Sequence, residues 1–182
     1  MARTVRERLK EILVKESLLR GDFTLASGQR SSFYLDVRRT SMHPEGAYLC
    51  AGLLLEGLED LDIGAVGGPV LGAAPLVGAL AAESFRRGRP LPTFLVRKEP
   101  KGHGTAKLIE GLFPTDKPVA LIEDVVTTGS SVLRALAVAR GEGATVSRVL
   151  CVVDREQGGA EAFAEQAVDF RALFQVSELL AD

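Results

Sequence analysis

Short apolar segments alternate with segments of helical length along most of this chain, and this alternation limits the folds it can adopt. Strand-like runs are expected at 63–68, 92–98, 118–124, 145–154 and 169–175. Helices are expected between them, at 72–88, 130–143 and 159–167. Apolar strands connected by helices predict an α/β fold, in which a parallel sheet is covered by helices on both faces. Such sheets bind ligands at the carboxyl ends of their strands.

The N-terminal third differs from this pattern. A helix is expected from Thr4 to Leu19, ending at Gly21, followed by β-like pieces at 22–27 and 31–37. Another helix is expected from Pro44 to about residue 61. With 182 residues, of which 46% are hydrophobic, the chain is long enough for one core. We therefore expect residues 1–182 to form a single domain.

Composition narrows the classes of function. The formal net charge of −2 argues against binding nucleic acid through bulk positive charge. Apolar runs stay well below the roughly 18 residues of a membrane span, so no membrane partner is expected. Cys50 and Cys151 lie in apolar runs without the spacing of a metal site. Two buried free thiols are expected, which indicates a reducing cytoplasm.

An acidic pair stands beside a cluster of hydroxyl residues in the segment VALIEDVVTTGSSV, residues 119–132. The apolar run predicts a buried strand, with Glu123 at its tip and Asp124 just past its end. Residues 127–131 then turn the chain into a helix, where backbone N–H groups and the helix dipole favour a phosphate. A simple N-cap would explain the hydroxyls but not two adjacent acids. Carboxylates there suit a polyhydroxylated ligand or a hard cation such as Mg²⁺, and a phosphorylated sugar meets both conditions.

A basic segment, LVRKEPKGHGTAKLIEG, follows an earlier strand. Arg97 and Lys98 end that strand, and Lys101 and His103 follow among glycines and a proline that disfavour regular structure. The simpler interpretation of this segment is a solvated surface loop without a function. Four basic groups in seven residues, beside a predicted phosphate site, favour a lid that closes on an anionic substrate.

The acidic segment resembles the phosphoribosyl-diphosphate (PRPP) binding motif of type I phosphoribosyltransferases. The resemblance implies that Glu123 and Asp124 hold the ribose hydroxyls, with Asp124 also assisting a Mg²⁺ ion that is bound mainly through PRPP. The adjoining turn would hold the 5-phosphate, which extends the PRPP-binding set to Val125, Val126, Thr127, Thr128, Gly129, Ser130 and Ser131.

The pattern R-K-x-x-K-x-H-G, followed by Glu110 and Gly111, looks like the catalytic loop of orotate phosphoribosyltransferases. The resemblance implies that Arg97, Lys98, Lys101 and His103 contact the diphosphate of PRPP. Lys101 and His103 would be catalytic, together with Asp124. In this family the loop covers the active site of the partner subunit, so a homodimer with a loop shared in trans is expected.

Two more segments resemble the orotate pocket of the family. Residues 31–34 would line the base, with Phe33 and Tyr34 in contact with it, and Thr127 would reach the same pocket. Arg155, in VVDREQGG, would pair with the orotate carboxylate, which suits its planar fork. There are departures from some relatives. Ala26 stands where they have a lysine, and Leu71 and Gly72 replace a Tyr-Lys pair in the pyrophosphate loop, residues 67–75.

These features together predict a type I phosphoribosyltransferase fold, a central parallel sheet flanked by helices with a small N-terminal hood. The hood would come mainly from residues 1–40 and the C-terminal segment. The expected reaction is orotate plus PRPP giving orotidine 5-phosphate and pyrophosphate, in de novo pyrimidine biosynthesis. The alternatives are a purine or uracil phosphoribosyltransferase, or a regulator that senses PRPP without catalysis.

Overall fold

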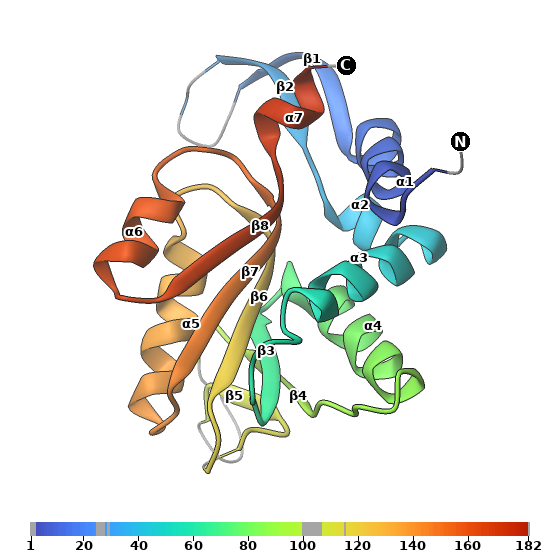
Figure 1. Cartoon of the computed structure of the whole chain (residues 1–182). Coiled ribbons are helices and arrows are strands. Elements are labelled where there is room, and N and C mark those ends of the chain that lie inside the picture. The colour runs from blue at the N-terminus through green and yellow to red at the C-terminus, as the bar shows by residue number, and fades with distance from the viewer. Residues whose placement is uncertain (1–2, 25–27, 29, 100–106, 115, 182) are drawn as a thin grey trace.

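A six-stranded sheet forms the centre of the computed structural model (Figure 1). The structure describes residues 3–24, 28, 30–99, 107–114 and 116–181. The strand order is β5-β4-β3-β6-β7-β8, and every pairing is parallel except that of β5 with β4. The strands are β3 (Ala65–Pro69), β4 (Thr93–Val96), β5 (Ile109–Gly111), β6 (Val119–Val126), β7 (Val146–Asp154) and β8 (Asp169–Gln175). The expected parallel α/β sheet is confirmed.

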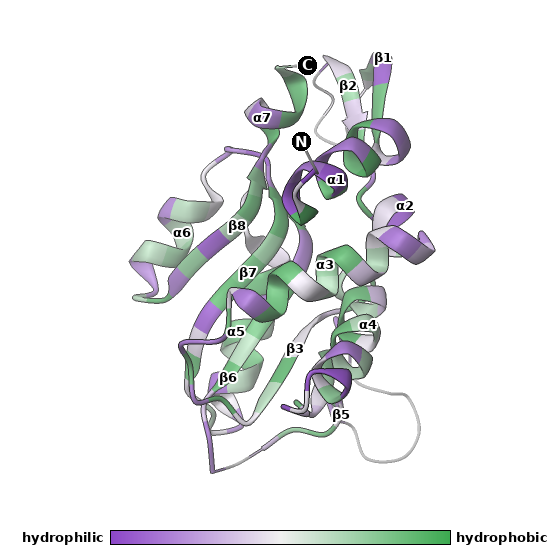
Figure 2. Cartoon of the chain, turned by 45° about the vertical axis from the view of Figure 1, so that its right-hand side comes forward, coloured by the Kyte–Doolittle hydropathy of each residue, from purple (hydrophilic) through white to green (hydrophobic). Residues whose placement is uncertain are grey.

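Helices cover both faces of this sheet (Figure 1). On one face lie α3 (Pro44–Glu56) and α4 (Ala73–Arg86), and on the other α5 (Ser130–Gly141) and α6 (Gly159–Glu165). Strand β6 is buried on both sides, because Ile122 faces the core beneath α3 and α4 while Leu121 faces the opposite core. Figure 2 shows hydrophobic residues along the central strands and on α3 and α4. This two-sided burial explains why β6 begins with an uninterrupted apolar run, residues 119–122.

A second, two-stranded sheet lies near the carboxyl ends of the central strands (Figure 1). It is a hairpin of β1 (Leu18–Thr24) and β2 (Arg30–Leu35), joined to α3 by the short helix α2 (Arg38–Ser41). The hairpin follows α1 (Val5–Ile12) and a π-helical stretch, Leu13–Ser17. The first helical segment therefore ends before the predicted Leu19, because Leu18 pairs with Leu35 in the hairpin.

The C-terminal helix α7 (Val176–Leu180) packs with this N-terminal unit. Arg6 of α1 forms an ion pair with Glu178 at 2.6 Å, donates to the carbonyl of Leu173 and stacks over Phe174. The sequence did not predict α2, α7 or β5, each of which has five residues or fewer. Such short elements lack enough residues to show a period.

The structure also defines the cap of α3 and the state of the two cysteines. His43 caps α3, because its Nδ1 accepts a hydrogen bond from the N–H of Gly46 at 3.3 Å. Cys50 and Cys151 are both free and buried. Among the described residues, no helix has the length and the apolar character needed to cross a membrane.

Candidate active site

The acidic pair lies inside strand β6, whereas the sequence placed Asp124 beyond the strand end. Strand β6 continues to Val126 because Val125 and Val126 pair with Val153 and Asp154 of β7. The pairing is set by the neighbouring strand, which the local sequence does not show. Both carboxyl groups consequently stand at fixed points of the ladder, near the carboxyl ends of β6 and β7.

Hydrogen bonds orient the two carboxylates. Glu123 is buried, with 4% of its surface exposed, and its Oε2 accepts from the Ser131 hydroxyl at 2.9 Å. Its Oε1 accepts from the N–H of Asp124 at 3.2 Å. The Asp124 Oδ1 accepts from the N–H of Val125 at 2.8 Å. Each acid therefore has oxygen lone pairs left for a ligand.

Burial shifts the ionisation of this pair. Loss of water raises the pKa of Glu123 well above its usual range, and the neighbouring Asp124 charge adds to the shift. Burial also raises the pKa of Asp124, while Arg38 acts in the opposite direction. In the absence of a ligand, burial therefore favours a bound proton on this pair. Ligand hydroxyl groups or a cation would favour the charged carboxylates.

The turn after β6 has the geometry of an anion site. Gly129 adopts a left-handed conformation with φ of 75°, and a Cβ there would lie 2.9 Å from the ring of Phe163. Helix α5 begins at Ser130, and its N-cap is Gly129, which has no side chain to make a capping hydrogen bond. The N-terminal N–H groups of α5 thus remain available for an anion. The expected turn is confirmed, and the simple N-cap interpretation does not hold.

Gly72 brings a second loop against the acids. An added Cβ at this position would lie 2.3 Å from Asp124 Oδ1 and 2.5 Å from Glu123 Oε1. Only a residue without a side chain leaves the carboxylates in place. The peptide bond between Val70 and Leu71, just before Gly72, is cis. This loop connects β3 to α4, so two strand-to-helix turns meet at the acidic pair.

A cavity of about 350 Å³ opens in front of the carboxylates. It brings together residues of the hairpin, the β3–α4 loop, the end of β4 and strand β6. The lining residues are Tyr34, Leu35, Asp36, Val37, Arg38, Val70, Leu71, Gly72, Lys98, Glu123, Asp124, Val125 and Ser131. Of the sites predicted from sequence, Tyr34, Lys98, Val125 and Ser131 therefore share one cavity with the acidic pair.

The remaining basic residues are distributed differently. Arg97 lies beside Lys98 at the end of β4, where its Nη1 is 3.8 Å from Glu110 Oε1. A small hollow next to Ser131 is lined by both Arg97 and Lys98. Lys101 and His103 lie outside the described residues, as does Ala26.

Arg155 and Phe33 meet at the carboxyl end of β7. The Arg155 guanidinium carbon is 5.6 Å from the centre of the Phe33 ring. Its Nε is buried and has no hydrogen-bond partner within the described part of the chain. The backbone N–H of Arg155 donates to Val126 O at 2.8 Å, which places it next to the half-buried Thr127. A buried donor of this kind normally has a partner, so a ligand anion would complete it.

Arg38 and Asp36 also line the cavity, although no sequence motif pointed to them. Their nearness to the acids depends on how the hairpin folds over the sheet. The sequence signal that could have pointed to them is the segment LDVRR, in which charged residues come directly after a predicted strand.

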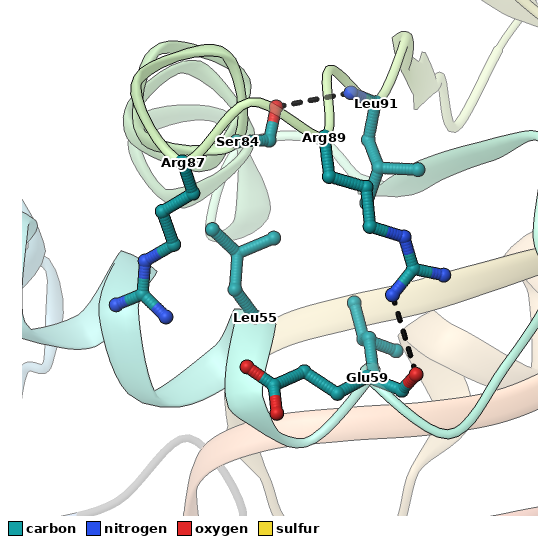
Figure 3. A pocket seen from close by; sticks show the side chains of 7 residues that line it. Leu55, Glu59, Ser84, Arg87, Arg89 and Leu91 are labelled. Carbon is teal, nitrogen blue, oxygen red and sulfur yellow. Dashed lines mark hydrogen bonds between the residues drawn. The ribbon is translucent and has the colours of Figure 1, made fainter.

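Another cavity of about 350 Å³ lies at the C-terminal ends of α3 and α4 (Figure 3). Its two arginines and Ser84 already have partners. Arg87 Nε donates to Glu83 at 2.8 Å, Arg89 donates to the carbonyls of Glu59 and Leu61, and the Ser84 hydroxyl accepts from the N–H of Leu91. These interactions join two helix ends, and the acidic pair lies elsewhere, so we place the chemistry at the first cavity.

An acidic pair near the end of a central strand, a glycine-containing turn into a helix beside it and a covering hairpin, on a parallel sheet, define the class of type I phosphoribosyltransferases. No family model matches the chain. Orotate phosphoribosyltransferase of Bradyrhizobium sp. (strain ORS 278) is 46% identical over 179 residues, covering 96% of this chain and 97% of that protein. The enzyme of Aquifex aeolicus (strain VF5) is 43% identical over 178 residues, covering 96% and 97%.

Solved structures agree with these relatives. Mycobacterium tuberculosis H37Rv orotate phosphoribosyltransferase in complex with Fe(III) dicitrate matches with a TM-score of 0.88 and 36% identity, covering 97% of this chain and 99% of that one. The same enzyme in complex with PRPP matches with a TM-score of 0.83 and 35% identity, over the same shares. This chain belongs to the orotate phosphoribosyltransferase family.

Proposed function

We infer that this protein transfers the 5-phosphoribosyl group of PRPP to orotate, giving orotidine 5-phosphate and pyrophosphate in pyrimidine (UMP) biosynthesis. One observation carries this proposal. The carboxylates of Glu123 and Asp124 face a cavity that also contains cationic side chains and adjoins the phosphate turn. A ligand with hydroxyl groups in its middle and phosphates at both ends matches that order of groups.

The acids and the turn would hold the two halves of ribose 5-phosphate. Glu123 and Asp124 accept hydrogen bonds from the ribose 2- and 3-hydroxyls, which favours their charged forms. The backbone from Val125 through Ser131 surrounds the 5-phosphate. Ser131 belongs to the phosphate turn and also donates a hydrogen bond to Glu123, so this hydrogen bond connects the phosphate site to the sugar site.

The leaving pyrophosphate needs positive charge. Arg97 and Lys98 stand at the end of β4, and Lys98 lines the cavity. We propose that Lys101 and His103 join them as the catalytic cations, with Asp124 on the sugar side. Cations where negative charge accumulates lower the barrier to expulsion of pyrophosphate, and closing the site excludes water that would hydrolyse the ribosyl centre.

The base would lie between the hairpin and the end of β7. The unpartnered Nε of Arg155 supports pairing of this guanidinium with the orotate carboxylate. Phe33, which already contacts Arg155, would cover a face of the pyrimidine, and Tyr34 would line the entrance. Thr127 contributes a hydroxyl beside the backbone of Arg155.

The residues present fit a Mg²⁺ ion that is shared with the substrate. Carboxylate oxygens are ligands that Mg²⁺ prefers. Among the described residues, no three acidic, histidine or cysteine side chains come together. Asp124 would therefore hold the ion indirectly, mainly through PRPP oxygens and water. When bound, the ion would neutralise charge on the diphosphate.

We further propose a homodimer whose basic loop acts in the partner's site. Supporting this, Met42 is exposed just after α2, Tyr48 and Phe85 are exposed on α3 and α4, and α3 and α4 pack together. A mixture of Lys101→Ala and Asp124→Asn subunits tests the sharing. The mixed dimers should regain activity that neither variant has alone, and absence of recovery would refute a loop shared in trans.

Two broader proposals follow. The contacts of α7 with α1 support one domain over residues 1–182, with a hood formed mainly by residues 1–40 and the C-terminal segment. The free buried thiols of Cys50 and Cys151 support a cytoplasmic location.

A direct assay tests the function. The purified protein with Mg²⁺ and PRPP should form orotidine 5-phosphate from orotate and should leave uracil and adenine largely unreacted. Equal turnover of uracil or adenine would indicate another type I transferase. Binding of PRPP without any product would indicate a sensor.

A further inference from the structure

The β3–α4 loop offers no cationic side chain to the substrate. Residues 67–75, GGPVLGAAP, contain neither lysine nor arginine. Gly72 lies against the acidic pair, and Leu71 is 67% exposed. The loop can therefore give a diphosphate only backbone groups. Two negative phosphoryl groups beside two carboxylates need charge from another element.

Arg38 supplies a cation from a different element that lines the same cavity. It is the first residue of α2, directly after the hairpin, and it lines the cavity with Lys98, Gly72 and Asp124. The hood thus adds a guanidinium to the cavity that the β3–α4 loop also lines.

The corner that carries Arg38 is firmly held. Asp36 Oδ1 accepts from Arg38 Nε at 2.9 Å, and Asp36 Oδ2 accepts from Nη2 at 3.3 Å. The N–H of Asp36 donates to the carbonyl of Ser17 at 3.0 Å, and the buried hydroxyls of Ser17 and Thr40 are 2.6 Å apart. The backbone that carries Arg38 is therefore fixed. The hydrogen bonds of Nε and Nη2 to Asp36 also orient its guanidinium group.

Its donors are not exhausted. A guanidinium has five N–H donors, and Asp36 accepts from two of them. The Arg38 side chain is 42% exposed, so the remaining donors can reach a ligand in the cavity. Arginine donors of this kind match phosphate oxygens well.

The position suits the diphosphate rather than the 5-phosphate. The turn at residues 127–131 lies at the start of α5, and of this turn only Ser131 lines the cavity. In PRPP, the 5-phosphate and the diphosphate leave the ribose ring at opposite ends. With the ribose on the acids and the 5-phosphate on the turn, the diphosphate extends into the part of the cavity that Arg38 and Lys98 line.

We propose that Arg38 binds the diphosphate of PRPP from the hood side and stabilises pyrophosphate as it leaves. Asp36 is its positioning residue, which holds the guanidinium fork toward the cavity. The proposal rests on the function inferred above. It explains how this chain could bind the diphosphate with Leu71 and Gly72, and no lysine, in the pyrophosphate loop, because Arg38 supplies the positive charge from a different element.

Calorimetric titration of the whole protein with pyrophosphate, ribose 5-phosphate and PRPP, each with Mg²⁺, tests the assignment. Arg38→Gln should weaken pyrophosphate and PRPP binding by about 10- to 100-fold, and should change ribose 5-phosphate binding by less than about threefold. Arg39→Gln is the matched control, since Arg39 is the adjacent arginine of α2, is exposed and does not line the cavity. It should bind all three ligands as the wild type does.

Unchanged pyrophosphate binding in Arg38→Gln would overturn the proposal. An equal loss of affinity for ribose 5-phosphate and pyrophosphate would also overturn it, because it would indicate that Arg38 only offsets the negative charge of the two acids. Asp36→Asn should give a smaller, pyrophosphate-selective loss. Should Arg38→Gln not fold, Arg38→Lys keeps the charge without the fork. It should bind pyrophosphate more weakly than the wild type, and equal binding would refute the role of the fork. Orotidine 5-phosphate formation by the wild type is scored separately, so failure of the inferred reaction is distinguishable from failure of this assignment.

Discussion

Replacement of Glu123 by glutamine should stabilise the folded protein while it weakens the site. The carboxyl group is buried beside Asp124, and burial raises its pKa from an ordinary value of 4.5 to about 8. In the folded state this group therefore binds a proton more strongly than in the unfolded chain. Between pH 4.5 and pH 8 the wild type loses stability as the pH rises, because folding then requires either a proton or a buried charge.

The size of the effect follows from the shift. One pKa unit corresponds to about 1.4 kcal/mol, so the full shift corresponds to about 5 kcal/mol. Asp124 shares the same proton, and we expect about 2–3 kcal/mol for Glu123 alone. For a chain of this length that is a rise of about 5–10 °C in the melting temperature. The glutamine carbonyl can accept from the N–H of Asp124, and its amide can donate to the Ser131 oxygen.

Scanning calorimetry of the ligand-free protein at pH 5 and pH 8.5 measures this difference. Glu123→Gln should melt close to the wild type at pH 5 and clearly above it at pH 8.5, with PRPP affinity reduced about 10- to 100-fold. Glu165→Gln, an exposed change on α6, is the control and should shift neither curve. If Glu123→Gln melts at or below the wild-type temperature at pH 8.5, the result would contradict the conclusion that burial of the charged carboxylate destabilises the wild type at that pH.

Two further substitutions separate the subsites. Arg155→Ala should weaken orotate binding at least tenfold more than PRPP binding, because the lost contact is to the base carboxylate; equal losses measured by titration would refute that assignment. Gly72→Ala should abolish PRPP binding while leaving the melting temperature within a few degrees, because the new methyl group collides with both carboxylates, 2.3 and 2.5 Å away. Near-normal PRPP affinity in Gly72→Ala would show that the loop can move away from the acids.

Much of the fold was predictable because its signals are local. The run of residues 118–122 is apolar throughout, and in the structure β6 is buried on both faces, which is the pattern of a central parallel strand. Gly129 and the hydroxyl residues around it predicted the turn into a helix, and the structure has that turn. The acidic pair was visible because two adjacent carboxylates at a buried strand are costly without a function.

Other features depend on partners that the local sequence does not specify. Strand β6 extends to Val126 because it pairs with β7. Strand β5 forms because residues 109–111 pair with the edge of β4. The helix expected to reach Leu19 ends earlier because Leu18 joins a hairpin with Leu35. In each case a backbone pairing far along the chain decides the boundary.

The sequence by itself determined the class of fold, the acids and the phosphate turn, because each is written in consecutive residues. Only the tertiary structure showed that Gly72 touches the carboxylates, that Arg38 faces them from the hood and that Arg155 keeps an unpartnered Nε next to Phe33. The physical reason is that these contacts join segments far apart in the chain, and their geometry is set by how the hairpin and the loops pack around one end of the sheet.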